Sequence, residues 1–186
     1  AETLFQASQS FYRMEQLDNS EAQLRQAIRI NPNHLGAHLL LGRVLLETQR
    51  FVEAVTALEE AYRFDESTAR PDLVRALLAL ANVQSDEERK ISIYTRILQC
   101  DPHQPIAKEQ TQKIWLARGE QFFKAGDLEA ALAAFTYAAS QPHIQRVHQA
   151  KMQQAVEHAQ QLEAAEDWQA ALNLYKNLRA QYALTQ

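Results

Sequence analysis

The chain repeats itself, and this constrains its fold more than any other feature of the sequence. Five stretches of ten residues share one order of small and large apolar residues. They are EQLDNSEAQL, QRFVEAVTAL, SDEERKISIY, GDLEAALAAF and EDWQAALNLY, which begin at residues 15, 49, 85, 126 and 166. Their starts are 34, 36, 41 and 40 residues apart. Self-similarity at such a period is the signature of a repeat array, in which each unit buries its apolar face against its neighbours.

Composition predicts that each repeat is a pair of helices. The 186 residues include only four glycines, and no run of alternating β-branched residues indicates a strand. Pro71 suits the first turn of a helix, and Ser85 with Glu88 three residues later reads as a capping box. The predicted helices cover residues 2–14, 18–30, 35–47, 51–64, 71–83, 86–99, 105–124, 128–140, 143–164 and 168–183.

The pattern resembles the tetratricopeptide repeat, whose signature is W-x2-L-G-x2-Y, then A-x3-F, then P. Repeat four carries most of it, with Arg118 in the place of the expected Leu. Its matching residues are Trp115, Gly119, Phe122, Ala131, Phe135 and Pro142. Repeat three is the weakest match, because Lys90 stands where a small residue is usual.

The resemblance implies an all-α, right-handed α-solenoid of antiparallel helix pairs, with about ten helices. It implies a single repeat domain over residues 1–186, with repeats at about 1–34, 35–69, 70–104, 105–142 and 143–186. We expect the chain to be a fragment of a larger protein. Its last helix presents apolar residues without a polar cap, so we expect either that further repeats or a docked domain follow in the larger protein, or that the chain self-associates through this C-terminal edge. These residues are Leu172, Leu174, Tyr182 and Leu184.

Small residues recur where the two helices of a pair should cross. Helix axes approach to about 8–10 Å only when small side chains lie at the contact. We therefore expect each small residue of the first helix to meet one of the second, with large residues interlocking one turn away. The first set is Ser8, Gly42, Gly119 and Ala159, and the second is Ser20, Ala54, Ala131 and Ala171. The large residues are Phe11, Leu45, Phe122 and Leu162 against Leu24, Leu58, Phe135 and Tyr175.

Several functional classes find no support in the sequence. A net charge of −4 with no Lys/Arg cluster argues against a nucleic-acid partner, and no apolar stretch is long enough to span a membrane. His34 and His38 lie four residues apart, but no clustered Asp, Glu or Cys completes a metal site. Cys100 has no partner in a known motif, and the glycines form no phosphate loop. We expect a cytoplasmic protein that is not an enzyme and binds no cofactor or metal.

What remains is the surface that such arrays offer to partners. A solenoid of helix pairs is curved, and the first helix of each pair lines the inside of the curve. By resemblance, the groove residues are those that flank the packing positions of these helices. We assign to the groove Phe5, Tyr12, Arg13, Leu39, Arg43, Leu46, Val74, Leu78, Leu116, Phe123 and Lys124. The alternative for any one of them is burial by the adjacent repeat.

The main hypothesis is a protein–protein interaction scaffold or adaptor that binds an apolar or amphipathic peptide segment in this concave groove. The alternative is a regulatory or sensor arm of a multidomain signalling protein, linked for example to an NTPase, with mainly intramolecular contacts. A helical enzyme is the third and weakest hypothesis. A closed, deep pocket with convergent polar groups would favour it.

Overall fold

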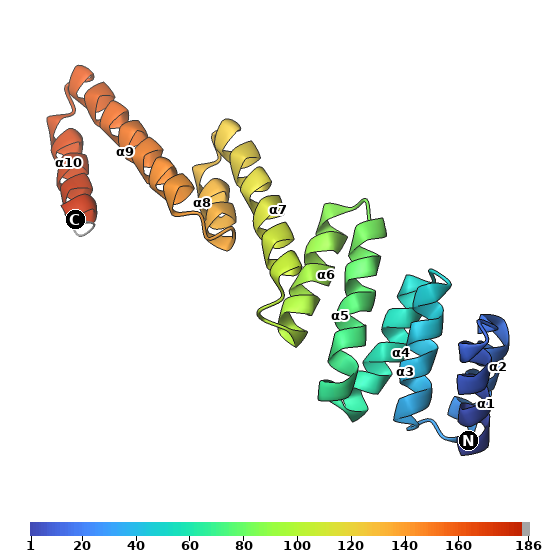
Figure 1. Ribbon diagram of the computed structural model, residues 1–186. Coiled ribbons are helices and arrows are strands. Elements are labelled where there is room, and N and C mark those ends of the chain that lie inside the picture. Colours follow the sequence, from blue (N-terminus) through green and yellow to red (C-terminus); the bar gives the residue numbers. More distant parts are fainter. Residues whose placement is uncertain (184–186) are drawn as a thin grey trace. The chain divides into compact units, whose positions relative to one another are not determined.

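Ten α-helices and no strands make up the part of the chain described by the structure, a computed structural model covering residues 1–183 and side chains as far as Ala180. This confirms the predicted all-α class of antiparallel helix pairs (Figure 1). The helices are α1 (Glu2–Arg13), α2 (Leu17–Ile30), α3 (Leu35–Glu47), α4 (Phe51–Phe64), α5 (Glu66–Val83), α6 (Glu87–Cys100), α7 (Pro105–Lys124), α8 (Leu128–Tyr137), α9 (Gln141–Ala164) and α10 (Trp168–Ala183).

The chain divides into two compact units, Ala1–Thr111 and Gln112–Gln186. Helix α7 contributes residues to both. The assignment of one domain to residues 1–186 stays a prediction.

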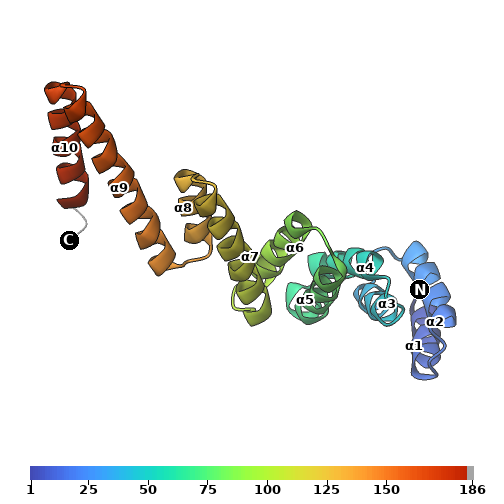
Figure 2. The same ribbon diagram turned by 90° about the horizontal axis from the view of Figure 1, so that it is seen from above.

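In the first unit, each odd-numbered helix packs against its own even-numbered partner and against the one before it. Helix α3 thus contacts α2 and α4, and it also contacts α1 and α5 directly. In Figure 2, α3 and α5 lie side by side, and α4 packs along both of them. Successive odd-numbered helices therefore share one face of this unit, as predicted for the inner helices.

One backbone conformation ends the first helix of four repeats. The residue two positions before each following helix has a left-handed backbone, with φ of 59° at Glu15, 60° at Gln49, 81° at Gly126 and 62° at Glu166. Two hydrogen bonds close the turn, as when Arg50 N donates to the carbonyl of Leu45 at 2.8 Å and Gln49 N to that of Leu46 at 3.1 Å. This is a Schellman motif, which turns the chain sharply into the next helix.

Replacing Gln49 with glycine is expected to stabilise the first unit by about 1 kcal/mol, because a left-handed backbone costs about 1–2 kcal/mol for a residue with a Cβ. The gain is partly offset by the greater freedom of glycine in the unfolded chain. The measurement is the midpoint of urea unfolding followed by circular dichroism. Ser85 is the matched control: it stands at the same place before α6, and its φ is not positive. Ser85→Gly should lower the midpoint, and a rise in both variants would contradict the proposed cause.

Helix α5 begins at Glu66, five residues before the predicted start, so Pro71 lies inside the helix and not in its first turn. The cause is Asp65, whose carboxylate accepts hydrogen bonds from Thr68 N at 3.1 Å, Thr68 Oγ1 at 2.6 Å and Ser67 Oγ at 2.7 Å. The hydrogen bonds from Thr68 and Ser67 lower the pKa of Asp65 to about 2. Pro71 therefore lies six residues after the N-cap, at an exposed position inside the helix.

The predicted capping box at Ser85 and Glu88 is wrong. Helix α6 begins at Glu87, and Asp86 caps it by accepting a hydrogen bond from Glu88 N at 2.9 Å. Aspartate is as good an N-cap as serine, and its place next to the helix decides the start.

The small residues do lie at helix crossings, although their neighbours differ from the prediction. Ser8 and Ser20 meet directly, because Ser20 Oγ donates to the buried carbonyl of Ser8 at 2.9 Å. Gly42 instead faces Leu58, one turn beyond Ala54: a Cβ on Gly42 would lie 2.3 Å from Leu58 Cγ. A Cβ on Gly119 would likewise lie 2.4 Å from Phe135 Cε1. The glycines therefore make room for the large residue of the partner helix.

The second unit has a core centred on Phe135, together with Leu128, Ala131 and Val147. Trp115 of α7 stacks on Tyr137 of α8, with ring centroids 4.7 Å apart, and the guanidinium of Arg118 lies 5.4 Å from the Trp115 centroid. Arg118, which stands in the place of the Leu of the repeat pattern, thus lies against an aromatic ring.

Phe122 was predicted to pack inside the pair, but it is 39% exposed. Its neighbour Phe123 instead packs against the Phe135 core. Helix α9 has 24 residues against 10 in α8, so it extends beyond α8 (Figure 1). Tyr182 and Leu184, predicted to belong to the C-terminal edge, lie outside the described side chains.

Candidate functional site

The candidate site is the face that α1, α3 and α5 share in the first unit. We call it the inner face and define it by Tyr12, Arg13, Leu39, Arg43, Leu46, Glu47, Asp72, Arg75 and Leu78. Helical spacing puts Leu39, Arg43 and Leu46 on one side of α3, because residues three and four apart are neighbours on a helix. Polar contacts then join this side of α3 to both neighbouring helices.

Tyr12 links α1 to α3, since its phenol donates a hydrogen bond to Glu47 Oε1. Burial raises the pKa of the Tyr12 phenol, and the hydrogen bond and negative charge of Glu47 raise it further. The positive charges of Arg43 and Arg75 act in the opposite direction. Groups from all three helices therefore lie close enough to influence one phenol.

Arg43 links α3 to α5. Its Nε lies 2.7 Å from Asp72 Oδ2, and Arg75 Nη2 lies 3.1 Å from the other oxygen of the same carboxylate. Asp72 is only 8% exposed, whereas the two arginines are exposed. The carboxylate thus fixes two guanidinium groups at the surface, where they can still reach a ligand.

The apolar members of the predicted groove have different environments. Leu39, Leu46 and Leu78 are half-buried, so each keeps part of its side chain at the surface. Val74 is buried in the core. Phe5 packs on the start of α3, with its ring 4.8 Å from that of His34 and its Cζ 2.8 Å from the place of a Cβ on Gly36. Phe5 therefore fills the contact between the first two repeats.

The structure places the other three predicted groove residues in the second unit. Leu116 and Phe123 pack against the Phe135 core, and Lys124 is exposed. The guanidinium of Arg146 lies 4.2 Å from the Phe123 centroid and donates to Glu120 Oε1 at 2.7 Å. The hydrogen bond from Arg146 lowers the pKa of Glu120. The ion pair between Glu120 and Arg146 thus joins α7 and α9, the odd-numbered helices of this unit.

Sequence reasoning missed Asp72 and Arg75. Both lie within the predicted helix 71–83, but only its apolar Val74 and Leu78 were assigned to the groove. The start of this helix was also placed at Pro71 and not at Glu66. The Asp-Glu-Ser-Thr sequence at residues 65–68 was the available signal, because an aspartate three residues before a threonine amide is a common helix start.

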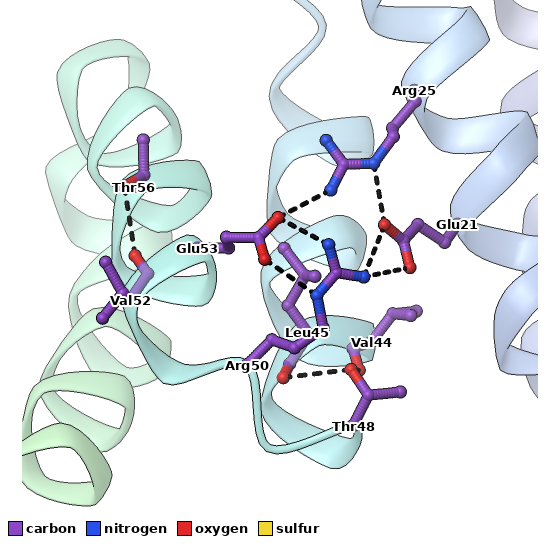
Figure 3. A network of polar contacts seen from close by, with 9 residues as sticks. All are labelled: Glu21, Arg25, Val44, Leu45, Thr48, Arg50, Val52, Glu53 and Thr56. Carbon is purple, nitrogen blue, oxygen red and sulfur yellow. Dashed lines mark hydrogen bonds and ion pairs between the residues drawn. The ribbon is translucent and has the colours of Figure 1, made fainter.

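A second polar network joins the first two repeats at their even-numbered helices (Figure 3). Arg50 donates to Glu21 of α2 at 2.8 Å and to Glu53 of α4 at 2.6 Å, and Arg25 contacts both carboxylates. Burial raises the pKa of Glu21, but the hydrogen bonds from Arg25 and Arg50 outweigh it, and the pKa lies below its usual value. The hydrogen bond from Arg50 likewise lowers the pKa of Glu53. Each carboxylate and each guanidinium of this network has a partner of opposite charge, so the network joins the first repeat to the second.

Each unit has an open pocket among its helices. One, of about 380 Å³, lies among α2, α3 and α4 and includes His38 and Leu41 in its wall. The other, of about 640 Å³, lies among α8, α9 and α10, with Ala155 and His158 at the corresponding positions. The small side chain of Ala155 fits the larger volume.

The residues that the structure describes contain no group of three or more His, Cys, Asp or Glu that could hold a metal ion. In the same part of the chain, no helix combines the length and the apolar character needed to cross a membrane.

Comparisons with known proteins agree with this architecture. The family model of the tetratricopeptide repeat matches residues 5–72. A repeat protein of this type from Bacteroides fragilis shares 12% identity, with a TM-score of 0.58 over 96% of this chain and 84% of that one. A thermophilic repeat protein from Thermus thermophilus shares 17% identity, with a TM-score of 0.48 over 96% and 97%. No curated protein matches the chain.

At 12% identity the Bacteroides structure establishes the fold alone, and residues 5–72 carry the family match. Repeats of this kind generally serve as scaffolds for protein–protein interaction. The first repeats thus match the tetratricopeptide-repeat model over residues 5–72, and antiparallel helix pairs continue after them.

Proposed function

We propose that the chain is an interaction scaffold whose inner face binds an apolar or amphipathic segment of a protein partner. The observation that supports this most is the set of Tyr12, Arg43 and Arg75, held on the three odd-numbered helices α1, α3 and α5 by Glu47 and Asp72. Aromatic and arginine side chains contribute most to binding at interfaces, and fixing them in advance reduces the entropy lost on binding.

The residues of the face also indicate the chemistry of the segment. Leu39, Leu46 and Leu78 supply apolar surface beside the arginines. The charged residues of the face are Arg13, Arg43, Arg75, Glu47 and Asp72, which give a net charge of +1 (three positive, two negative). A helix with an apolar stripe flanked by a carboxylate fits this surface. We propose that the chain acts in the cytoplasm by binding alone, without catalysis.

The test compares partner capture by variants of the full chain. Tyr12→Ala should remove an anchor of the inner face and lower partner affinity at least about tenfold, since truncation of an anchor residue costs about 2 kcal/mol or more. Proteins captured from the source lysate by the wild-type chain would be identified by mass spectrometry, and their affinity for each variant then measured.

Thr56→Ala is the matched control, because Thr56 is exposed on α4 and bonds only to the carbonyl of Val52 among the contacts drawn in Figure 3. Both variants should keep the far-ultraviolet circular dichroism of the wild type. A partner that binds Tyr12→Ala and wild type equally well does not use the inner face, and the proposal then fails.

A further inference from the structure

The pocket among α2, α3 and α4 has a volume of about 380 Å³, within the range of about 300–1,000 Å³ that is usual for binding pockets. The apolar residues that line it are Leu41 and Leu45 of α3, Ile28 of α2 and Ala57 of α4. None of the residues that define the inner face lines this pocket. We call it the Arg29 pocket, because Arg29 of α2 also belongs to its lining.

The two helices that flank the pocket, α2 and α4, begin at the same end of it. Glu21 near the start of α2 and Glu53 near the start of α4 both contact Arg50, at 2.8 and 2.6 Å. One turn further along α2, Arg25 Nη2 lies 3.0 Å from Glu53 Oε2, so an ion pair crosses from one helix to the other (Figure 3). This ion pair closes the end of the pocket that lies near Arg50.

The next turn of the two helices lacks such an ion pair. Arg29 stands four residues after Arg25, on the same side of α2. In α4, the residue four positions after Glu53 is Ala57, which also lines the pocket. Alanine has no carboxylate, so Arg29 lacks the partner that Arg25 has. Among the residues that the structure describes, the side chain of Arg29 makes no ion pair or hydrogen bond.

The other polar residues of the lining have partners. Glu60 lies on the α4 side of the pocket, and its carboxylate is 3.3 Å from Arg63 of the same helix. His38 of α3 donates a hydrogen bond from its Nε2 to the carbonyl of Pro32 at 2.7 Å. Within the described part of the chain, Arg29 is therefore the polar residue of this lining that is left for a ligand.

The lining indicates the chemistry of the ligand. Ile28 and Arg29 are consecutive in α2, so an apolar group in the pocket and an anion at the guanidinium must lie close together in the bound molecule. Guanidinium groups bind carboxylates through two parallel hydrogen bonds. The pocket is open to the surface, whereas sites for small molecules bury about 70–90% of the ligand. An apolar side chain presented by another protein therefore fits this pocket better than a free small molecule.

We propose that the Arg29 pocket is a second docking site, which takes a leucine or phenylalanine side chain of a protein partner and pairs Arg29 with the carboxylate of the residue next to it. The partner's carboxylate would act at Arg29 as Glu53 acts at Arg25. Burial of the apolar side chain against Leu41 and Leu45 would supply most of the affinity, and the ion pair would select acidic neighbours over neutral ones. The pocket shares no residue with the inner face, so this proposal does not rest on the proposed function.

Titrations of the isotope-labelled full chain with short peptides, followed by NMR, test the proposal. The probes are acetyl-Gly-Phe-Glu-Gly-amide, the analogue with Gln in place of Glu, and the analogue with Ala in place of Phe. The acidic peptide should shift the backbone amide signals of Ile28, Arg29 and Ala57 until they saturate. The Gln analogue should bind about fivefold more weakly, as expected for the loss of an exposed ion pair. The Ala analogue should produce no saturable shift.

Two variants separate the charge of Arg29 from the shape of the pocket. Arg29→Gln should bind the acidic and the neutral peptide equally well, because the cation that distinguishes them is gone. Ala57→Glu should abolish the same preference, since it gives Arg29 a carboxylate within the chain at the place that Glu53 has for Arg25. Arg29 is exposed, so Arg29→Gln should keep wild-type circular dichroism and decides the test even where Ala57→Glu does not fold.

Arg89→Gln is the matched control, because the Arg89 side chain is 74% exposed on α6 and does not line the pocket. This variant should keep the wild-type preference for the acidic peptide. An acidic peptide that shifts no signal around the pocket would overturn the proposal. Equal binding of this peptide to the wild type and to Arg29→Gln would also overturn it.

Discussion

Replacing Phe135 with alanine is expected to lower the unfolding free energy of the second unit by about 3–5 kcal/mol, the range found for aromatic residues removed from protein cores. Phe135 is completely buried, and it is the largest side chain of its cluster. Its ring contacts His143 at a centroid distance of 4.8 Å, and it fills the space left by Gly119. No neighbouring side chain can fill the space without leaving its own contacts, so the cavity would remain.

Intrinsic tryptophan fluorescence can measure this loss of unfolding free energy. Its two tryptophans, Trp115 and Trp168, both belong to the second unit, so tryptophan fluorescence follows the unfolding of that unit. The fluorescence midpoint in urea should fall sharply in Phe135→Ala, in proportion to the lost free energy.

Leu58→Ala is the matched comparison. Leu58 is the equivalent residue of the first unit, eight positions into α4 as Phe135 is into α8, and it is also fully buried. Its loss should shift the transition seen by circular dichroism in a unit without tryptophan. A fluorescence midpoint that does not move in Phe135→Ala would show that the core around this residue is wrongly assigned.

The repeat period predicted most of the fold because it averages over five copies of one pattern. Helices α3 and α4 lie at the predicted residues, 35–47 and 51–64. Prediction failed where one residue changes a helix start, as Asp65 does for α5 and Asp86 for α6. A single side-chain hydrogen bond at an N-cap decides such a boundary, and a pattern of apolar residues carries no information about it.

The inner face was predicted only in outline for a related reason. The resemblance to the repeat family assigned Tyr12 and Arg43 to the groove, and the structure places them on the neighbouring helices α1 and α3, which the Tyr12–Glu47 hydrogen bond joins. The link from Arg43 to Asp72 depends on how α5 is shifted along α3. Predicting contacts between helices therefore requires the shift of one helix along the other, which the local pattern of apolar residues does not determine. Whether the whole predicted set binds a partner stays a prediction.

Replacing Gly42 with alanine is expected to destabilise the first unit by about 1–3 kcal/mol, the usual cost of overpacking a core. The sign of this change in unfolding free energy is informative, because alanine in place of glycine normally stabilises a helix by about 1 kcal/mol. Here the new Cβ would lie 2.3, 2.7 and 2.9 Å from three carbons of Leu58, whereas carbons in contact are about 3.5–4.0 Å apart. Leu58 is fully buried, so it cannot move away without displacing its own neighbours.

A double-mutant cycle separates this clash from any other effect of the substitution. Leu58→Ala alone should cost about 2–5 kcal/mol, the range for leucine removed from a core. In that background the space next to Gly42 is empty, so Gly42→Ala should become neutral or stabilising, which gives a coupling energy of about 1–3 kcal/mol between the two sites. Urea unfolding followed by circular dichroism measures all four corners of the cycle. Equal effects of Gly42→Ala in both backgrounds would mean that the glycine does not set the distance between α3 and α4. Because the same small residue recurs as Gly119 opposite Phe135, the cycle tests the feature that allows the helix pairs of both units to pack closely.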